Sequence, residues 1–363
     1  DIGPDTAVGG SRMHLNEYQW PPSPEVLDAL GRLATGREGA ALLSQYATGS
    51  PPEVLTAVAG YAEVPGPDNI VLVAGSAEAL RAVVDMCAQR KIMRAICGVP
   101  TYTHFAQFVR LRGLAFVEYR LDLRPDEVGR LKSLRQHAAM MAAGALVYLG
   151  NPNNPNGGLW SRGAVACLAD TYPNSVFLVD EAYTEFAGVA LSDAPITLDD
   201  AAARLNAASL AREAALHANI IVTRTFSKAF GLAGVRIGYA LAAPNTAREL
   251  RAHISPKSVT HIAMACARAC LLPSALAYYG VNAQRTALER ARIREYFETR
   301  GWYCVDTCAN YVLLWAGADA DADALVARLA ARGVHIRNRT SEPSLAGFVR
   351  ITAGNPDTTR ALT

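Results

Sequence analysis

Lys228 is the residue whose type and surroundings most favour covalent chemistry. It stands in TFSKAFGLAGVRIGYA (residues 225–240), a stretch of small residues and glycines that follows an apolar run. The chain has 35 lysines and arginines together, but its only lysines are Lys91, Lys132, Lys228 and Lys257. An amine can lose its proton and attack a carbonyl carbon, whereas a guanidinium cannot. Lys228 is therefore the candidate nucleophile.

Three more side chains have the chemistry needed to hold a planar ring that contains nitrogen. Asp180 ends the apolar run SVFLVD (175–180), and its carboxylate could pair with a protonated ring nitrogen. Tyr183 stands three residues later with a phenol that can form a hydrogen bond, and Tyr102 could lie flat against a ring.

A second group of residues could bind an anion. Arg236 carries a guanidinium, Thr225 and Ser227 carry hydroxyl groups, and residues 75–77 offer backbone amides where a helix is predicted to begin. A cofactor with an aldehyde, a basic ring nitrogen and a phosphate would use both groups of residues. Pyridoxal 5′-phosphate is such a molecule.

Short apolar runs bounded by turn residues recur along the first 250 residues, with helical stretches between them. They are residues 70–75, 93–98, 145–150, 175–180, 219–224 and 235–242. This alternation predicts a mostly parallel, buried sheet with helices on its faces. Two helix starts are also predicted: Ser50 and Glu53 suggest a capping box, and Ser23 precedes Pro24.

Polar, glycine-rich or ionisable groups follow five of these runs. They are residues 75–78, 100–102, 151–158, 180–183 and 225–228. In a doubly wound sheet the ligand lies at the carboxyl ends of the strands. The layout therefore predicts one composite site rather than five unrelated loops.

After about residue 250 the pattern changes to longer helical segments with a few strands. We predict helices over 286–301 and 323–333, and strands over 310–317, 334–337 and 347–354. Such a tail is typical of a smaller α+β domain. The expected division is a large cofactor-binding domain over 39–250, with 1–38 and 251–363 forming an N-terminal segment plus the small C-terminal domain.

The composition is that of a globular chain. With 51% hydrophobic residues, 19% charged residues and a formal charge of +2, it favours neither nucleic acid nor an anionic membrane as a partner. The longest apolar stretch, 138–149, is too short for a bilayer span of about 20 residues, and no basic and apolar leader follows Asp1. The seven cysteines lack metal-ligand spacing, so we expect reduced thiols, no metal and a cytoplasmic location.

The ordered motifs NPNNPNG, DEAYTEF and SKAFGLAGVRIGY resemble fold type I pyridoxal-phosphate-dependent aminotransferases of class I/II. The resemblance is greatest to the histidinol-phosphate aminotransferase group and extends from about Leu15 to Asp357. It implies a large α/β domain with a mostly parallel sheet flanked by helices, plus a smaller α+β domain. It also implies a transaminase that takes the amino group from an amino acid or an amino-acid-like amine and gives it to a 2-oxo acid.

The resemblance assigns roles to the residues around the cofactor ring. Lys228 would form the Schiff base and, once released, shuttle a proton. Asp180 would pair with the pyridine nitrogen, while Tyr183 and Asn154 would hydrogen-bond the ring hydroxyl oxygen. Tyr102 would stack on the ring face.

The resemblance also assigns the phosphate and substrate contacts. The phosphate would be held by Arg236, Ser227, Thr225 and the amides of Ser76 and Ala77, and Tyr46 would reach the phosphate in the neighbouring subunit. That last role implies a homodimer with shared active sites. Arg350 would grip the substrate α-carboxylate, Asn310 would lie near the same site, and Arg337 would contact a second anion.

Each assignment has a plainer alternative. Lys228, Arg236 and Arg350 could be surface charges, Arg337 could be a solvated arginine at a strand end, and Asp180 could only cap a helix. The tyrosines Tyr46, Tyr102 and Tyr183 could simply pack.

Two stretches depart from the pattern of this group. LNEYQWPP (15–22) has Tyr18-Gln19-Trp20 in place of Asn-Glu-Asn, and Pro22 where a tyrosine often contacts the substrate phosphate, so the amino donor stays open. Residues 188–214 lengthen one connection and are expected to form an extra helix at the surface. The alternative function is a lyase, decarboxylase or cyclase, because the same cofactor grip serves these reactions too.

Overall fold

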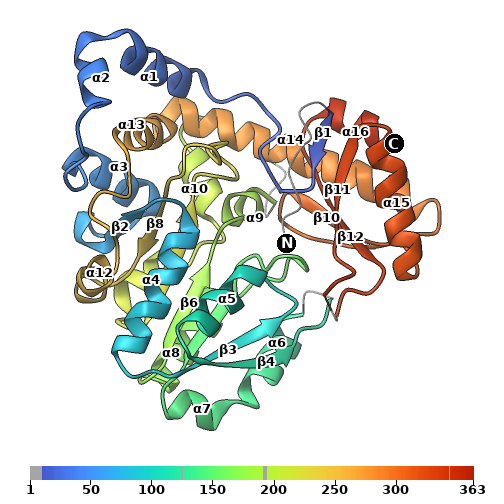
Figure 1. The fold of residues 1–363 in the computed structure, drawn as a ribbon, viewed down its shortest axis with the longest axis horizontal. Helices are drawn as coiled ribbons and strands as arrows, with labels where there is room; N and C mark the ends of the chain where they lie inside the picture. The colour runs from blue at the N-terminus through green and yellow to red at the C-terminus, as the bar shows by residue number, and fades with distance from the viewer. Residues whose placement is uncertain (1–9, 124–125, 191–193, 343) are drawn as a thin grey trace.

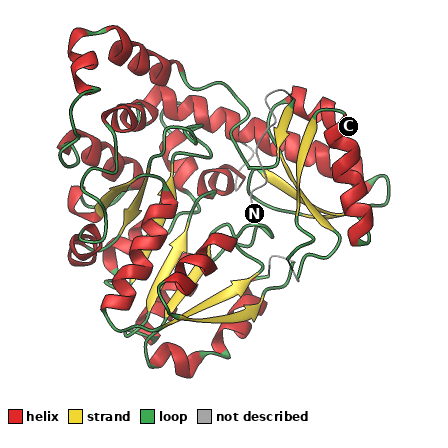
Figure 2. Ribbon diagram, in the orientation of Figure 1, coloured by secondary structure: helices red, strands yellow, loops and turns green. Residues whose placement is uncertain are grey.

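The structure is a computed structural model that describes residues 10–123, 126–190, 194–342 and 344–363. These residues form two separate β-sheets, the larger at the lower left and the smaller at the right of Figures 1 and 2, and a long helix runs from above the larger sheet to the smaller one. Each sheet has its own apolar core.

The larger sheet has seven strands, in the order β2-β8-β7-β6-β5-β3-β4. The strands are β2 (Ile70–Val73), β3 (Arg94–Val99), β4 (Ala115–Arg120), β5 (Leu146–Gly150), β6 (Val176–Asp180), β7 (Ile220–Thr225) and β8 (Gly238–Leu241). Neighbouring strands are parallel, except that β8 is antiparallel to β2 and β7. The predicted mostly parallel sheet is confirmed, and each of the six apolar runs overlaps one of its strands.

Strand β4 is not among the predicted strands. It lies at the edge of the sheet and pairs only with β3, and its sequence AFVEYR has mostly exposed or partly exposed side chains. An edge strand needs no continuous apolar run, which is the feature that identifies the buried strands.

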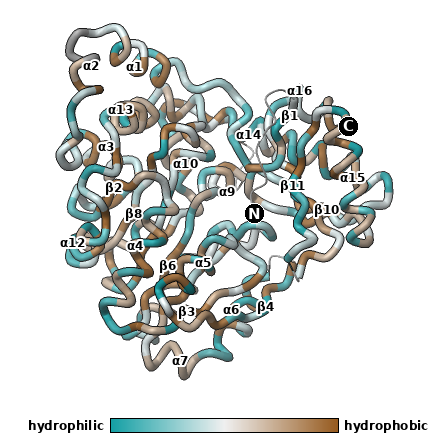
Figure 3. The backbone as a smooth tube through the Cα atoms, in the orientation of Figure 1, coloured by the Kyte–Doolittle hydropathy of each residue, from teal (hydrophilic) through white to brown (hydrophobic). Residues whose placement is uncertain are grey.

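Helices cover both faces of this sheet. They include α4 (Ser76–Gln89), α5 (Thr103–Leu111), α6 (Glu127–Arg135), α7 (Ala138–Ala142), α8 (Arg162–Thr171), α12 (Pro244–Arg251) and the 3₁₀ helix η1 (Pro67–Asn69). Along β5, Leu146 and Val147 belong to different buried clusters, because successive strand residues point to opposite faces. Figure 3 shows hydrophobic residues along β3 and β6, inside this layer.

The smaller sheet has the order β1-β11-β12-β10-β9. Its strands are β1 (Ser11–Met13), β9 (Tyr303–Val305), β10 (Tyr311–Trp315), β11 (Val334–Asn338) and β12 (Phe348–Thr352), covered by α15 (Asp319–Ala331) and α16 (Pro356–Leu362). β1 pairs in parallel with β11, so the N-terminal segment joins the C-terminal sheet. The predicted strands and helix of the tail are present, while the domain boundaries themselves remain a prediction.

The remaining helices join and flank the two sheets. They are α1 (Pro24–Thr35), α2 (Arg37–Leu42), α3 (Pro52–Ala62), α9 (Thr184–Ala190), α10 (Ala201–Asn206), α11 (Ala211–Leu216), α13 (His261–Cys270) and α14 (Pro273–Glu298). Helix α14 contacts both α9 and the small-sheet strands β9 and β10. It contains most of the predicted helix over 286–301 and begins much earlier in the chain.

The expected capping box at Ser50 is wrong. Helix α3 begins one residue later than that pattern requires, its N-cap is Pro51, and no side chain caps its amides. Proline has no side-chain oxygen that could accept a hydrogen bond. The start at Ser23 is confirmed, because Ser23 is the N-cap of α1, although its hydroxyl makes no capping bond.

The extra helix expected over 188–214 requires a correction. The described residues of this segment contain the end of α9, the short helix α10 and the beginning of α11, rather than one extra helix. The stretch 194–200 is mostly exposed, but Leu205 and Asn206 are buried where α10 packs against α9 and α14. The segment is therefore only partly a surface feature.

No single helix among the described residues is long and apolar enough to cross a membrane. The pair α13 and α14 meets the length and composition requirement only when the two are taken together, and they are bent by 76°.

Candidate active site

The carboxyl ends of the large-sheet strands meet the small sheet at a cavity of about 330 Å³. Twelve of the fourteen residues singled out from the sequence line it: Ser76, Ala77, Tyr102, Asn154, Asp180, Tyr183, Thr225, Ser227, Lys228, Arg236, Arg337 and Arg350. The composite site expected at the strand ends is thus one continuous surface.

Lys228 follows β7 and reaches into the cavity. Its side chain is partly buried, and Nζ donates a hydrogen bond to the carbonyl oxygen of Leu15 at 2.9 Å. Burial lowers the pKa of Lys228 to about 8, and the positive charges of Arg350 and Arg236 act in the same direction against the opposing effect of Glu17. The neutral amine, which is the nucleophilic and basic form, is therefore much more populated near neutral pH than in an ordinary lysine, and it predominates above about pH 8.

Asp180 ends β6 and is 8% exposed. Its Oδ2 accepts a hydrogen bond from the Tyr148 hydroxyl at 2.8 Å, and its Oδ1 accepts one from Thr223 Oγ1 at 3.2 Å. Burial raises the pKa of Asp180, and the two hydroxyl donors oppose that rise. The carboxylate is held rigidly in a place where a cationic ring nitrogen would stabilise its charge.

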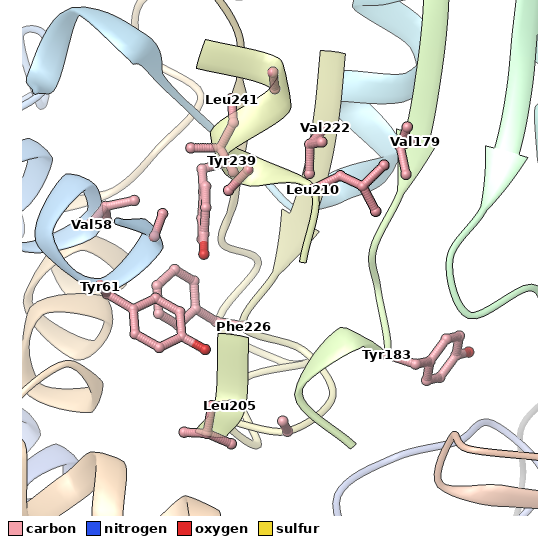
Figure 4. Close-up of a cluster of buried hydrophobic side chains, with 14 of the residues drawn as sticks. Val58, Tyr61, Val179, Tyr183, Leu205, Leu210, Val222, Phe226, Tyr239 and Leu241 are labelled. Atoms are coloured by element: carbon pink, nitrogen blue, oxygen red, sulfur yellow. The ribbon is translucent and has the colours of Figure 1, made fainter. Parts of the chain in front are cut away.

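The two predicted aromatic residues occupy different walls of the cavity. The Tyr183 hydroxyl accepts a hydrogen bond from Asn16 Nδ2 at 2.9 Å, and burial raises the pKa of Tyr183. Figure 4 shows Tyr183 at the edge of the buried apolar cluster, apart from Tyr61 and Tyr239. Tyr102 stacks on His104 with ring centroids 5.1 Å apart.

A cradle of donors forms where α4 begins. Gly75 has φ of +86°, and a Cβ at this position would overlap the Arg236 guanidinium, so a glycine is needed for the close approach. Arg236 itself has φ of +60°, a strained conformation of the kind found at functional sites. Thr225 Oγ1 donates to Ser227 Oγ at 2.9 Å, and the Ser227 amide donates to Thr225 Oγ1 at 3.1 Å.

The helix start, the two hydroxyls and the guanidinium together suit a phosphate. Backbone amides at a helix N-terminus and an arginine are the usual donors for such an anion. The donor set and the space kept by Gly75 fit the phosphate expected from the sequence.

One wall of the cavity comes from the small sheet. Arg337 and Arg350 stand opposite each other in the antiparallel pair β11 and β12. Arg350 donates from Nη1 to Asn154 Oδ1 at 2.9 Å and from Nη2 to the carbonyl oxygen of His14 at 2.8 Å. Burial lowers the pKa of Arg350 to about 10, so it remains a cation near neutral pH.

Two predicted residues do not line this cavity. Tyr46 is 75% exposed, and its ring lies 4.0 Å from Lys257 Nζ, so its expected role in a neighbouring subunit stays a prediction. Asn310 is buried beside the cavity, where its Nδ2 donates to the carbonyl oxygen of Asn16 at 3.2 Å. Asn310 therefore contacts Asn16, the same residue that donates a hydrogen bond to the Tyr183 hydroxyl.

Sequence reasoning missed several lining residues. Leu15 and Glu17 line the cavity, and the carbonyl oxygens of His14, Leu15 and Asn16 accept hydrogen bonds from Arg350, Lys228 and Asn310 respectively. Backbone carbonyls have no sequence signature. Tyr148 carries the one hydroxyl in the apolar run ALVYLG, which is a signal that could have been used. His104, Glu17 and Arg339 also line the cavity.

Among the described residues, no cluster of three or more His, Cys, Asp or Glu side chains could hold a metal ion. The arrangement instead offers an amine of lowered pKa, a buried carboxylate, a set of donors that could hold an anion, and a buried arginine that could bind a carboxylate. These groups can hold a phosphorylated aromatic aldehyde and a carboxylate-bearing amine side by side.

Comparison with known proteins agrees with this chemistry. The sequence model of the family "Aminotransferase class I and II" matches residues 12–362. The histidinol-phosphate aminotransferase of Aeromonas hydrophila subsp. hydrophila is 30% identical over 324 residues, which cover 86% of this chain and 81% of that protein. The aromatic amino acid aminotransferase of Thermobifida fusca is 30% identical over 358 residues, which cover 98% of this chain and 89% of that protein.

A solved structure shows the same architecture. The histidinol-phosphate aminotransferase of Sinorhizobium meliloti, in complex with pyridoxal 5′-phosphate, aligns with a TM-score of 0.77 at 27% identity. The alignment covers 97% of this chain and 88% of that one.

Proposed function

The chain belongs to the class I and II aminotransferase family, and we propose that it transfers an amino group from an amino acid or amino-acid-like amine to a 2-oxo acid, with Lys228 as the catalytic amine. Its cofactor is pyridoxal 5′-phosphate. The observation that carries the residue assignment is the meeting of Lys228, Asp180 and the anion cradle in one cavity.

When bound, pyridoxal 5′-phosphate supplies an aldehyde carbon that an amine can join and a ring that withdraws electrons from the bonds at Cα. Asp180 would keep the ring nitrogen protonated through its negative charge. Tyr102 would cover one face of the ring, and Tyr183 and Asn154 would hydrogen-bond the ring hydroxyl oxygen.

The cradle of donors at the start of α4 would hold the phosphate. Its members are Ser76, Ala77, Thr225, Ser227 and Arg236. Because the helix start and the guanidinium would bind the phosphate without a covalent bond, a variant that lacks Lys228 should still bind the cofactor.

Lys228 Nζ moves the proton. As a neutral amine it would take the proton from the substrate Cα and hold it for return to the product, which is the proton transfer that amino transfer requires. The lowered pKa of Lys228 supports this role, because a proton carrier works best when its pKa lies near the working pH.

Arg350 holds the substrate α-carboxylate through a two-pronged hydrogen bond. Arg337 lies opposite it and receives a second anionic group of the substrate or of its partner acid. The related enzymes named above act on histidinol phosphate and on aromatic amino acids, so both amino phosphates and amino acids belong in the test.

The assembly proposed for this enzyme is a homodimer with shared active sites, in which Tyr46 reaches the phosphate of the neighbouring subunit. Its support is the high exposure of this large aromatic side chain in the single chain. A cytoplasmic location is part of the same proposal, supported by seven cysteines that are all free thiols.

The test is a panel of amino acids and amino phosphates supplied to the holoenzyme with a 2-oxo acid. Formation of the new amino acid and of the aminated cofactor is expected. Release of ammonia or carbon dioxide without the aminated cofactor would instead favour a lyase or decarboxylase.

Replacing Lys228 with alanine tests the residue assignment. Turnover should fall by at least about 10²-fold, while cofactor binding remains measurable because the phosphate and ring contacts stay. Borohydride reduction of wild type followed by peptide mass analysis should locate the cofactor on Lys228 and nowhere else. Retained turnover in Lys228→Ala would contradict the assignment.

A further inference from the structure

Asn16 is a buried residue of the N-terminal segment that connects Tyr183 to the small sheet. Its side chain is 0% exposed, and Nδ2 donates a hydrogen bond to the Tyr183 hydroxyl oxygen at 2.9 Å. Its backbone amide donates to Thr352 Oγ1 on β12 at 3.0 Å, and its carbonyl oxygen accepts from Asn310 Nδ2 at 3.2 Å. The position of Asn16 beside Tyr183 is therefore fixed by contacts on the opposite wall of the cavity.

The Thr352 hydroxyl determines which way the Asn16 side-chain amide faces. Thr352 Oγ1 accepts the backbone amide proton of Asn16 and donates its own proton to Asn16 Oδ1 at 3.2 Å. Because the oxygen of the side-chain amide is bound to Thr352, its NH₂ group is the part that faces Tyr183. An NH₂ group has protons to donate and no lone pair with which to accept.

The contact with Asn16 leaves the proton of the Tyr183 hydroxyl without a partner in the protein. The hydroxyl oxygen receives the Asn16 proton, so the hydroxyl cannot donate its own proton to that nitrogen. Elsewhere in the described part of the chain, no residue accepts a hydrogen bond from this hydroxyl. Tyr183 lines the cavity, so its proton is available to an acceptor that binds there.

The backbone conformation at Asn16 restricts which residue can fill this position. Its φ is +54°, in the left-handed region. Asparagine, aspartate and glycine enter this region more readily than other residues. Of these three, asparagine is the one whose side chain also donates a hydrogen bond. The backbone and the hydrogen bond to Tyr183 together select asparagine.

Charged and titratable groups surround Tyr183 without taking its proton. Those that face it are Asp180, Lys228, Arg339, Arg350, Tyr102 and Tyr311. Arg350 and Arg339 favour the ionised phenol and Asp180 opposes it, while burial raises the pKa of Tyr183. These charges act on whether the phenol keeps its proton, whereas the hydrogen bond from Asn16 acts on where that proton points.

We propose that Asn16 is a positioning residue that holds the Tyr183 hydroxyl as a donor to the ring hydroxyl oxygen of bound pyridoxal 5′-phosphate. This inference rests on the proposed function, in which Tyr183 contacts that oxygen and Lys228 is the amine that joins the cofactor. A donor at the ring oxygen draws off negative charge, so the nearby nitrogen of Lys228 holds its proton less tightly. Asn16 therefore lowers the pH at which that nitrogen loses its proton.

The test is a pH titration of the holoenzyme followed by the absorbance of the bound cofactor. Asn16→Asp keeps the shape and the backbone preference but replaces the donor with an acceptor, so the Tyr183 proton should turn toward the new carboxylate. We expect the midpoint to rise by at least about one pH unit, because a hydrogen bond to a charged group is lost. Asn16→Gly removes the donor without adding an acceptor and should show less than about half of that rise.

Tyr183→Phe separates the direction of the proton from the added charge. Without the hydroxyl there is no proton to redirect, so Asn16→Asp should raise the midpoint in the Tyr183→Phe background by less than about half of its effect in wild type. A purely electrostatic effect of the new carboxylate would be equal in the two backgrounds. The matched control is Asn245→Asp, which adds the same charge at an exposed position on α12 and should leave the midpoint unchanged.

Thr352→Val gives an independent route that adds no charge to the site. It removes the hydroxyl that binds Asn16 Oδ1, so the side-chain amide is free to turn its oxygen toward Tyr183. The midpoint should rise in this variant too, and should not rise further when Thr352→Val is added to Tyr183→Phe. This variant decides the matter if Asn16→Asp does not fold.

Three results would overturn the proposal. They are an equal rise with Asn16→Asp in both Tyr183 backgrounds, a rise as large in Asn16→Gly as in Asn16→Asp, and an unchanged midpoint in the folded variants that redirect the proton. Failure of the proposed function looks different: borohydride reduction would leave Lys228 unmodified, and the wild-type absorbance would not change with pH.

Discussion

At the scale of single residues, the pKa of Lys228 depends on charges that come from distant parts of the chain. Burial disfavours its ammonium form, Arg350 and Arg236 add to that effect, and Glu17 opposes it. Arg350 belongs to the small sheet and Glu17 to the N-terminal segment. The same arginine that is proposed to hold the substrate carboxylate therefore also helps to keep the lysine neutral.

This coupling predicts a pH dependence. Lys228 attacks as the neutral amine, so the rate at which added pyridoxal 5′-phosphate becomes covalently attached to the apoenzyme should rise with pH through about 8. In Arg350→Gln a positive neighbour is lost, the ammonium form becomes less costly, and the midpoint should move to higher pH. Stopped-flow absorbance measures both profiles. A midpoint that moves to lower pH in the variant would contradict the coupling.

At the scale of elements, the phosphate cradle depends on how α4 begins. The chain turns from β2 into α4 at Gly75, whose positive φ allows the Arg236 guanidinium to pack directly on its backbone. Arg236 returns to this point from the loop before β8, and β8 lies beside β2 in the sheet. Strand order therefore brings the two halves of the cradle together.

Gly75→Ala should weaken cofactor binding. The new Cβ meets Arg236, and the positive φ adds a backbone cost of about 1–2 kcal/mol, so we expect a loss of affinity of about tenfold or more. Titration of the apoenzyme with cofactor, followed by absorbance, gives the dissociation constant. Gly163→Ala is the matched control, because nothing lies within 4 Å of a Cβ there. Similar constants for both variants would show that the close approach to Arg236 is unimportant.

A second element-scale feature lies behind the site, where β6 and β7 meet α9 to α11. The fully buried Arg224 pairs with Glu185 at 2.8 Å and lies 3.7 Å from Glu181, so two carboxyl groups share one guanidinium. Glu181 also accepts hydrogen bonds from the Leu210 amide at 2.6 Å and the Ser209 hydroxyl at 2.7 Å. These contacts connect the end of β6, where Asp180 lies, to the segment 188–214.

Glu181 should make stability depend on pH. Burial raises its pKa to about 7 from an ordinary value of 4.5, so the folded protein holds a proton there that the unfolded chain releases. The contribution to stability is present below pH 4.5 and is lost as pH rises through about 7. Glu181→Gln should therefore flatten the fall of the unfolding temperature between pH 5 and 8, as measured by calorimetry.

The control for this experiment is Glu295→Gln, an exposed glutamate on α14 that should keep the wild-type profile. The pKa values of Asp180 and Glu185 are also raised by burial, so a smaller slope of the same sign should remain in Glu181→Gln. A wild-type unfolding temperature that rises steadily from pH 5 to 8 would be inconsistent with this account.

At the scale of the whole molecule, the proposed dimer makes a prediction about mixed subunits. Tyr46→Ala removes the side chain proposed to act in the neighbouring site, and Lys228→Ala inactivates its own site. In a mixed dimer of the two variants, one site has both wild-type residues. Random mixing should therefore restore about a quarter of the wild-type activity from two weakly active proteins.

The measurement is the activity of the two variants after dissociation and reassociation together, with each variant treated alone as the control. Sedimentation should show a dimer in every sample. If the mixture is no more active than the average of its parts, Tyr46 does not act across subunits.

Much of the site could be predicted from the sequence because its parts are local. Lys228 with its small neighbours, Asp180 at the end of an apolar run and the helix start at Ser76 each depend on a few consecutive residues. The apolar runs have the length typical of buried strands, and polar or ionisable residues follow five of them, so these residues were expected at strand ends. Residues at the carboxyl ends of neighbouring parallel strands were expected to lie close together, and the cavity that they line confirms this expectation.

The sequence by itself thus determined six of the seven strands of the large sheet, the sheet edge at which polar groups gather, and the candidate reactive groups. Only the tertiary structure decided the backbone contacts of residues 14–17, the place of Arg339 beside Arg337 and Arg350, and the sharing of Arg224 by two glutamates. The physical reason is that the local sequence pattern indicates only which face of its own helix or strand a side chain lies on. The burial, charge compensation and pKa of that side chain depend on which residues from other parts of the chain lie opposite it.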